Sequence, residues 1–339
     1  MSARAVIFGC AGLTLGEEEK RFFADADPWG FILFARNCAD EVQIAALCAD
    51  LRAAVGRNAP IFIDEEGGRV SRLRAIGGRL GPAADIFARS GLPLEDQCQA
   101  VQANYAAIGA RLISMGIDAD CAPVLDLPMA NADPIISDRA FSTNPERAAI
   151  LGQACLDGLN SAGVAGVIKH IPGHGRADVD SHKALPVVSA SREDLKVHDF
   201  EPFKRLKNAP MAMTAHVIYS AFDPDNVATC SRIVIDEIIR GQIGFDGLLM
   251  SDDLDMQALA GSLGDRAEAV LGAGCDVVLQ CSGALDAMRE IMPFVPVLAG
   301  GALRRAEAAR AGVARTIIDV ADAEAVAEMW LSRIMGTRA

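Results

Sequence analysis

The feature of this chain that most constrains its fold is the alternation of short apolar segments with longer segments of helical spacing. Such alternation is typical of parallel βα units, in which each helix returns the chain to the start of the next strand. We predict eight strands, at residues 5–9, 30–34, 60–63, 117–122, 163–168, 210–214, 247–250 and 276–280. Eight units favour an α/β fold closed into a (β/α)8 TIM-type barrel over an open doubly wound sheet.

Helical spacing fills the intervals between these strands. The predicted helices cover residues 39–55, 94–115, 145–162, 192–207, 231–242, 264–273 and 283–293, followed by a helical tail at about 301–335. Long loops at 64–92 and 126–144 make the barrel somewhat irregular. Since no linker rich in Pro, Ser or Gly divides the chain, we predict one catalytic domain over residues 1–339.

Charge and composition exclude several classes of partner. The 32 basic and 45 acidic residues give a net charge of -13, which disfavours nucleic acid and membrane surfaces. The nine cysteines are scattered without a C-x-x-C pair, which indicates a reducing compartment. The first apolar run is too short for a signal peptide, so we expect a cytoplasmic protein. A P-loop and a dinucleotide fingerprint are both missing, so we predict no cofactor.

Titratable side chains follow five of the predicted strands. They are Asp64 after the third strand, Asp126 after the fourth, Lys169 and His170 after the fifth, His216 after the sixth, and Asp252 and Asp253 after the seventh. Active sites of such barrels are built at the C-terminal ends of the strands. We therefore expect these side chains to meet around one mouth.

The segment from Lys169 to His182 holds three of the five histidines. His170 and His174 have the spacing of a zinc-binding helix, but Pro172 and Gly173 between them prevent that helix. A solvated loop whose histidines bond only to backbone is the plainer interpretation. The density of titratable groups favours a catalytic one.

Asp180 and His182 are two apart, so in an extended loop their side chains point the same way. A carboxylate there can bond to the imidazole, fix its tautomer and raise its pKa, which makes a proton donor. The alternative is a turn aspartate beside an exposed histidine. At the seventh strand, only one of Asp252 and Asp253 is expected to face the mouth, as a nucleophile or metal ligand, while a helix N-cap is the alternative.

Four further side chains are candidates, and three of them have an ordinary structural alternative. Asp64 can accept hydrogen bonds from substrate hydroxyls, and Arg69 is either its partner or part of a structural ion pair. Arg139 lies in a loop and is either a ligand of the substrate or a surface charge. His216, a lone histidine at a strand end, is more often a structural group than a ligand.

Six motifs together resemble glycoside hydrolase family 3, and within it the single-domain bacterial β-N-acetylglucosaminidases. The motifs are K-H-I-P-G-H-G with D-S-H, I-D-E-E-G-G-R-V, D-R-A-F, M-T-A-H, G-L-L-M-S-D-D and the opening G-C-A-G-L-T-L with G-F-I-L-F-A-R-N. They occur in the family's order over most of the chain. The resemblance implies a barrel that hydrolyses terminal β-linked N-acetylglucosamine without a metal and with retention.

The resemblance also assigns roles to individual residues. Asp252 matches the nucleophile that forms a covalent glycosyl-enzyme, His182 the acid/base and Asp180 its partner. The positions that hold the sugar hydroxyls are matched by Asp64, Arg139, Lys169 and His170. The implied substrate is N-acetylglucosaminyl-anhydro-N-acetylmuramic acid, with or without peptide, in peptidoglycan recycling, and the enzyme is expected to be a monomer or a weak dimer.

The chain departs from the family's pattern at one place. Many relatives read G-D-T after P-G-H, whereas this chain has Gly175-Arg176-Ala177. Arg176 can contact an anionic muramyl or peptide group. Three alternatives stay open: a family 3 β-glucosidase of broader specificity, a metal-dependent hydrolase that uses His170, His182, His216 and Asp252, and a carbohydrate-binding barrel without activity.

Overall fold

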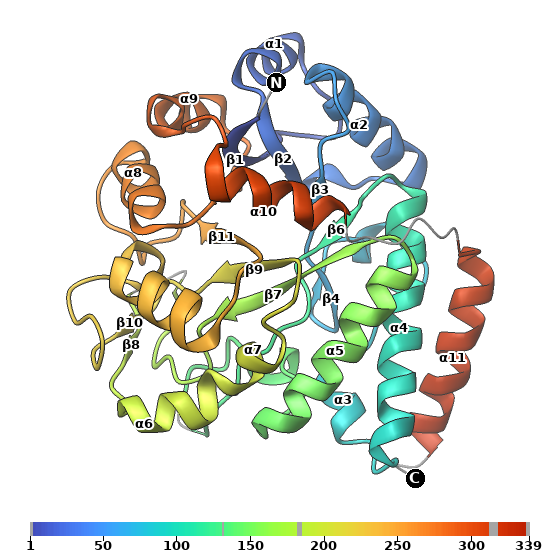
Figure 1. The fold of residues 1–339 in the computed structure, drawn as a ribbon. Coiled ribbons are helices and arrows are strands. Elements are labelled where there is room, and N and C mark those ends of the chain that lie inside the picture. Colours follow the sequence, from blue (N-terminus) through green and yellow to red (C-terminus); the bar gives the residue numbers. More distant parts are fainter. Residues whose placement is uncertain (1–2, 131, 182–184, 312–317, 337–339) are drawn as a thin grey trace.

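A closed parallel barrel forms the centre of the computed structural model, which describes residues 3–130, 132–181, 185–311 and 318–336 (Figure 1). Around the barrel the strand order is β1-β12-β11-β9-β7-β6-β3-β2, and every neighbouring pair is parallel. The strands are β1 (Arg4–Gly9), β2 (Pro28–Leu33), β3 (Ile61–Ile63), β6 (Ala119–Asp120), β7 (Ala165–Ile171), β9 (Met211–Thr214), β11 (Leu248–Asp253) and β12 (Val277–Gln280). The predicted fold class and all eight predicted strands are confirmed.

The strands are buried on both faces. Every residue of β3, β7, β9 and β12 is buried, as expected where helices cover the outside and side chains fill the inside. This is why the strands read as continuous apolar runs in the sequence. Polar residues interrupt the run at the C-terminal ends of two strands, where β7 ends with Lys169-His170-Ile171 and β11 with Ser251-Asp252-Asp253.

Helices surround the barrel in the predicted intervals. They are α2 (Glu41–Ala54), α4 (Leu94–Ser114), α5 (Pro145–Ser161), α6 (Arg192–Asp194), α7 (Glu201–Arg205), α8 (Leu263–Ala273) and α9 (Leu285–Ile291), with π-helical segments at Leu195–Asp199 and Val234–Ile243. The short α3 (Asp85–Ala88) and α1 (Glu17–Ala26) were not predicted. In α1 only Glu19, Phe23 and Ala26 are buried, so its apolar face is too narrow to stand out in the sequence.

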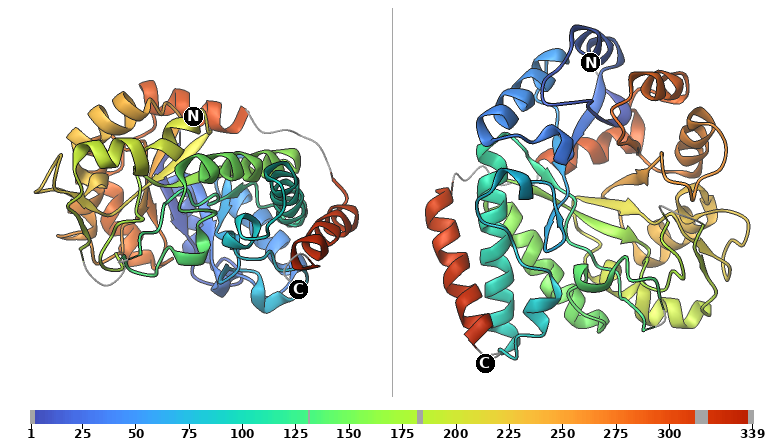
Figure 2. Two further views of the ribbon diagram at one scale, coloured as in Figure 1. Left: turned by 90° about the horizontal axis from the view of Figure 1, so that it is seen from below. Right: turned by 180° about the vertical axis from the view of Figure 1, so that it is seen from behind.

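The predicted helical tail consists of two helices with different positions. α10 (Gly300–Ala311) lies by the N-terminal ends of the barrel strands, where Arg305 forms an ion pair with Asp276 just before β12. α11 (Val320–Gly336) runs along the outside of α4 (Figure 2). There Ala323 and Ala327 pack against Ala107 and Ala110, and the small side chains let the two helices approach closely.

Two additions beyond the barrel build the mouth. A hairpin of β4 (Glu65–Gly67) and β5 (Val70–Ser71) follows β3 and occupies the start of the long predicted loop. A small parallel sheet joins β8 (Val187–Val188) to β10 (Ile218–Tyr219). In the part of the chain that the structure describes, no helix is long and apolar enough to cross a membrane.

Candidate active site

A cavity of about 260 Å³ lies at the C-terminal ends of the barrel strands. The charged and imidazole side chains in its wall are Asp64, Glu66, Arg69, Arg72, Arg139, Lys169, His170, His174, Asp252 and Asp253. Glu66 lies in β4, Lys169 and His170 in β7, and Asp252 and Asp253 in β11, whereas the others lie in the segments that follow β3, β4, β5, β6 and β7. The barrel thus brings together Asp64, Arg69, Arg139, Lys169, His170 and Asp252, six of the residues that the sequence singled out.

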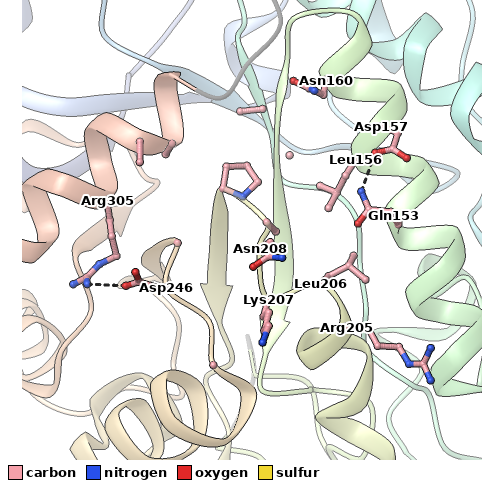
Figure 3. Close-up of a pocket in the computed structure, with 18 of the residues that line it drawn as sticks. Gln153, Leu156, Asp157, Asn160, Arg205, Leu206, Lys207, Asn208, Asp246 and Arg305 are labelled. Atoms are coloured by element: carbon pink, nitrogen blue, oxygen red, sulfur yellow. Dashed lines mark hydrogen bonds and ion pairs between the residues drawn. The ribbon is translucent and has the colours of Figure 1, made fainter.

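A larger cavity of about 520 Å³ lies at the opposite end of the barrel, between α5 and α10 (Figure 3). One wall carries Arg305 beside Asp246, and the other carries Gln153, which donates to Asp157 over 2.8 Å. None of the predicted site residues that the structure describes lies in its wall. Because catalytic groups of such barrels gather at the C-terminal ends of the strands, the smaller cavity is the candidate active site.

Glu66 and Lys169 are the centre of a buried ionic network. The Lys169 ammonium lies 2.8 Å from Asp64 Oδ1 and 2.5 Å from Glu66 Oε1. The Arg139 guanidinium binds both oxygens of Glu66, with Nε to Oε2 and one terminal nitrogen to Oε1, each over 2.8 Å. Arg72 donates to Asp64 Oδ2 over 2.9 Å. Positive and negative groups therefore alternate across the cavity wall.

This alternation keeps every member of the network charged. Burial by itself would raise the pKa of Glu66, but Lys169 and Arg139 outweigh it and lower the pKa to about 2. Burial likewise opposes the charge on Asp64, yet Lys169 and Arg72 hold the pKa of Asp64 well below its usual range. The same two carboxylates raise the pKa of Lys169 despite its burial. The wall therefore offers fixed ionic donors and acceptors to a polar ligand.

Arg69 has a different partner from Asp64. Its Nε lies 2.7 Å from Asp138 Oδ1, and a terminal nitrogen donates to the carbonyl of Pro134 over 3.0 Å. Of the two possibilities for Arg69, the structure shows the ion pair with another residue. Its side chain is still 43% exposed and lies in the cavity wall, so contact with a ligand is sterically open.

Asp126 orients the histidine at the end of β7. His170 Nδ1 lies 2.6 Å from Asp126 Oδ2, and Asp126 Oδ1 accepts the backbone N–H of His174 over 2.6 Å. Burial would raise the pKa of Asp126, but the adjacent His170 imidazole and these hydrogen bonds lower it. An ionised Asp126 can only accept this hydrogen bond, so Nδ1 of His170 carries a proton.

The two carboxylates at the end of β11 differ in their surroundings. Asp253 Oδ1 accepts backbone N–H groups from Cys281 over 3.1 Å and Asp255 over 3.2 Å, and burial together with Asp255 raises the pKa of Asp253 to about 6. Asp252 Oδ1 accepts the backbone N–H of Asp253 over 2.8 Å. Both residues lie in the cavity wall, so the expectation that only one faces the mouth was too strict. The carboxylate of Asp253 is thus held by backbone N–H groups of both Asp255 and Cys281.

The family of the chain follows from comparison with known proteins. The profile of the family described as "Glycosyl hydrolase family 3 N terminal domain" matches residues 11–311. The chain belongs to glycoside hydrolase family 3. A β-hexosaminidase of Bordetella avium is 38% identical over 301 residues, which cover 86% of this chain and 85% of that protein. One from Aromatoleum aromaticum is 37% identical, with 90% of this chain and 86% of that protein covered.

Solved family 3 structures have the same fold. NagZ from Neisseria gonorrhoeae superposes with a TM-score of 0.85 at 30% identity, over 100% of this chain and 99% of that one. A family 3 β-N-acetylglucosaminidase from Paenibacillus gives a TM-score of 0.79 at 29% identity over 99% of this chain. The present chain spans 62% of the Paenibacillus enzyme, which is therefore considerably longer.

His216 is one of the family 3 motif residues that lie outside the cavity wall. It is fully buried, with Nδ1 at 2.7 Å from Thr229 Oγ1 and Nε2 at 3.1 Å from the backbone oxygen of Asp253. Since both ring nitrogens contact protein atoms, His216 has the environment of a structural histidine. It supports the backbone that follows Asp252.

The loop after β7 carries the second half of the family 3 motif. Asp180 is buried and not part of the cavity wall, whereas its neighbour Ser181 is. His182 lies outside the described residues. His174 is buried with Nε2 at 3.2 Å from Ser181 Oγ, and burial together with the nearby His170 lowers the pKa of His174 to about 4. His174 is therefore neutral near pH 7.

Arg176 binds Asp199 and does not lie in the cavity wall, where the sequence suggested that it contacts an anionic ligand. Its Nε donates to Asp199 Oδ2 over 2.7 Å. The carboxylate of Asp199 is almost fully buried. Contact of Arg176 with an anionic ligand would require this pair to break.

Sequence reasoning missed Glu66, Arg72 and the orienting role of Asp126. Glu66 follows Asp64 by two residues in the I-D-E-E-G-G-R-V motif, and the period of two in an extended chain directs both to one side. That spacing was a usable signal. Arg72 offered none, because only the β4–β5 hairpin returns it to Asp64.

Proposed function

We propose that the chain is an exo-acting, retaining β-N-acetylglucosaminidase that removes terminal, non-reducing β-linked N-acetylglucosamine. The observation that carries the proposal is the ionic wall of the small cavity, with Asp252 beside it at the mouth of a family 3 barrel. Relatives named β-hexosaminidase and NagZ support the choice of sugar. A volume of about 260 Å³ suits one sugar unit, which favours cleavage at chain ends.

In the proposed first step the sugar binds with its hydroxyls against the network. Asp64 and Glu66 supply acceptors, Lys169, Arg139 and Arg72 supply donors, and His170 adds one further polar contact. Because these groups are already oriented by one another, binding costs little reorganisation. Asp252 Oδ then attacks the anomeric carbon, the bond to the leaving oxygen breaks, and a covalent glycosyl-enzyme forms.

The leaving oxygen requires a proton in that step. Ordinary retaining glycosidases supply it from a second carboxylic acid roughly 5 Å from the nucleophile. We assign this role to His182, charged with the help of Asp180, on the basis of the family 3 motif. After the leaving group departs, the neutral imidazole takes a proton from water, which attacks the anomeric carbon and releases Asp252. Two inversions give overall retention.

The biological setting is part of the same proposal. We assign GlcNAc-anhydro-N-acetylmuramic acid, with or without its peptide, as substrate in peptidoglycan recycling, and the cytoplasm as location. The net charge of -13 disfavours binding to nucleic acid or membrane surfaces. We further propose that residues 1–339 form one catalytic domain that acts as a monomer or weak dimer.

The test compares aryl β-N-acetylglucosaminide with aryl β-glucoside under identical conditions. We expect kcat/KM to favour the N-acetylated substrate at least about a hundredfold, because groups that bond to a substrate amide are left unpaired by its analogue. Proton NMR of the first product should show the β-anomer. Preference for the glucoside would support a broad β-glucosidase. Loss of activity on chelation would support a metal-dependent hydrolase, and sugar binding without turnover would support a carbohydrate-binding barrel.

A further inference from the structure

Arg176 and Asp199 form a partly buried ion pair at the base of the loop that carries Asp180. Arg176 Nε lies 2.7 Å from Asp199 Oδ2, and the two side chains are 20% and 2% exposed. Asp199 is the last residue of the π-helical segment Leu195–Asp199. The pair therefore connects the loop after β7 to the helical layer outside the barrel.

The rest of the loop base is held on its opposite side. The backbone carbonyl of Gly175 accepts the N–H of Met129 over 3.0 Å, and that of Ala177 accepts the N–H of Asp133 over 2.9 Å. A Cβ on Gly175 would lie 2.0 Å from the oxygen of Leu127, so only glycine allows this approach. The segment is thus packed between the 126–144 loop and Asp199.

Gly173 places the same segment directly against Asp199. It has φ of +136°, and a Cβ built on it would lie 3.2 Å from Asp199 Cβ and 3.3 Å from the Asp199 oxygen. Its carbonyl accepts a hydrogen bond from the Tyr219 hydroxyl. The stretch from Pro172 to Gly175 is therefore a fixed base, and the next residue, Arg176, supplies the charge that binds Asp199.

From this arrangement we propose that Arg176 and Asp199 are positioning residues for proton donation: their ion pair fixes the base of the loop that carries Asp180, the proposed partner of the acid/base. The inference rests on the proposed function. It replaces the idea that Arg176 binds an anionic part of the substrate. It also explains how this chain accommodates arginine where many relatives have the aspartate of G-D-T.

Removal of one partner should harm the loop more than removal of both. Arg176→Ala leaves the buried carboxylate of Asp199 with only the imidazole of His198, whose Nδ1 lies 3.4 Å from the same oxygen, and this is costlier than replacing both charges. Arg176→Asp restores the residue that many relatives have, but it places a second carboxylate against Asp199. We expect Arg176→Asp to be the most damaging substitution, and Arg176→Asp combined with Asp199→Asn to recover most of the loss.

The kinetic test compares a GlcNAc disaccharide, whose leaving group needs a proton, with 2,4-dinitrophenyl β-N-acetylglucosaminide, whose leaving group does not. For Arg176→Ala we expect kcat to fall about tenfold or more on the disaccharide, because acid catalysis usually contributes about 10²–10⁴ and the variant should lose a part of it. On the activated substrate kcat should fall less than about threefold. The double variant Arg176→Ala/Asp199→Asn should lose less than Arg176→Ala alone. The matched control is Arg304→Ala, which breaks an exposed ion pair with Asp246 at the other end of the barrel and should leave both rates unchanged.

Equal losses of kcat on the two substrates would overturn the proposal. So would a loss in the double variant that equals the product of the losses in Arg176→Ala and Asp199→Asn alone. A loss of activity confined to anionic muropeptides would instead support direct contact between Arg176 and the substrate. Hydrogen exchange needs no substrate and tests the pair separately from the proposed function: the amide of Ala177, bonded to the carbonyl of His174, should exchange faster in Arg176→Ala than in Arg304→Ala. Unchanged exchange would contradict the positioning role even if the unaltered protein hydrolysed no glycoside.

Discussion

Both oxygens of the Glu66 carboxylate accept a hydrogen bond from the Arg139 guanidinium, each over 2.8 Å. The same carboxylate lies 2.5 Å from the ammonium of Lys169. One buried anion thus orients two cations that come from separate loops and strands. Bidentate geometry fixes direction as well as distance, so Glu66 determines where both cations present their remaining donors.

Glu66→Gln should therefore impair sugar binding although we do not expect Glu66 itself to be the nucleophile. The amide keeps the shape of the carboxylate but attracts Lys169 and Arg139 less strongly. We expect kcat/KM on aryl β-N-acetylglucosaminide to fall about a hundredfold, since misplacement of catalytic groups by about 1 Å can cost that much. Steady-state kinetics on the folded variant measures it. A loss below about threefold would show that the two cations are held by other contacts.

The stability that Glu66 contributes should depend on pH in a defined window. Its pKa is lowered from 4.5 to about 2, so the folded state binds fewer protons than the unfolded state between these values. The contribution is complete above the unfolded pKa and is lost as the pH falls from 4.5 toward 2. Denaturant unfolding of the unaltered protein and Glu66→Gln should give free energies of unfolding that converge from about pH 6 to about pH 3. A constant difference would contradict the ionised network.

His174 should stay uncharged at every pH where the enzyme is expected to work. Burial and His170 lower its pKa from 6.5 to about 4, so its folded form resists protonation that the unfolded chain accepts. Its contribution to stability is complete above 6.5 and falls as the pH drops from 6.5 toward 4. NMR of the ring nitrogens should show a neutral imidazole from about pH 8 to about pH 5. Titration near the ordinary value of a histidine would reopen His174 as a proton donor.

His182→Ala should separate substrates by their leaving groups. Loss of the proposed acid should lower kcat about 10²-fold or more on a disaccharide, but only slightly on the 2,4-dinitrophenyl glycoside while formation of the glycosyl-enzyme limits the rate. Where release of the sugar limits the rate instead, added azide should replace water as the nucleophile and accelerate turnover of the activated substrate. Uniform losses across leaving groups would remove His182 from the role of acid.

The barrel could be predicted because its strands are apolar on both faces, a pattern that survives in the sequence as eight short runs. α1 could not, because Glu17, Glu18 and Glu19 obscure a face that buries few residues. The strand-end residues Asp64, Lys169 and Asp252 were placed correctly at one mouth by the topology alone. Contacts between side chains far apart in the sequence could not be predicted.

Glu66 and Arg139 illustrate the reason. They are 73 residues apart, and their contact depends on where an irregular loop lies, which carries no periodic signal. For Arg176, likewise, the sequence did not indicate the partner. The sequence identified the unusual residue, but its partner Asp199 is supplied by the helical layer, and only the packing of that layer shows that the charge is already satisfied.

The central claim is that Asp252 is the nucleophile of a retaining glycosidase. The most direct measurement is inactivation with a slow 5-fluoro N-acetylglucosaminyl donor, followed by mass spectrometry of the proteolysed adduct. We predict one sugar per chain on the peptide that contains Asp252, and no label in Asp252→Ala. A label on Asp253, Asp64 or any other residue, or turnover that survives Asp252→Ala, would contradict the proposed mechanism.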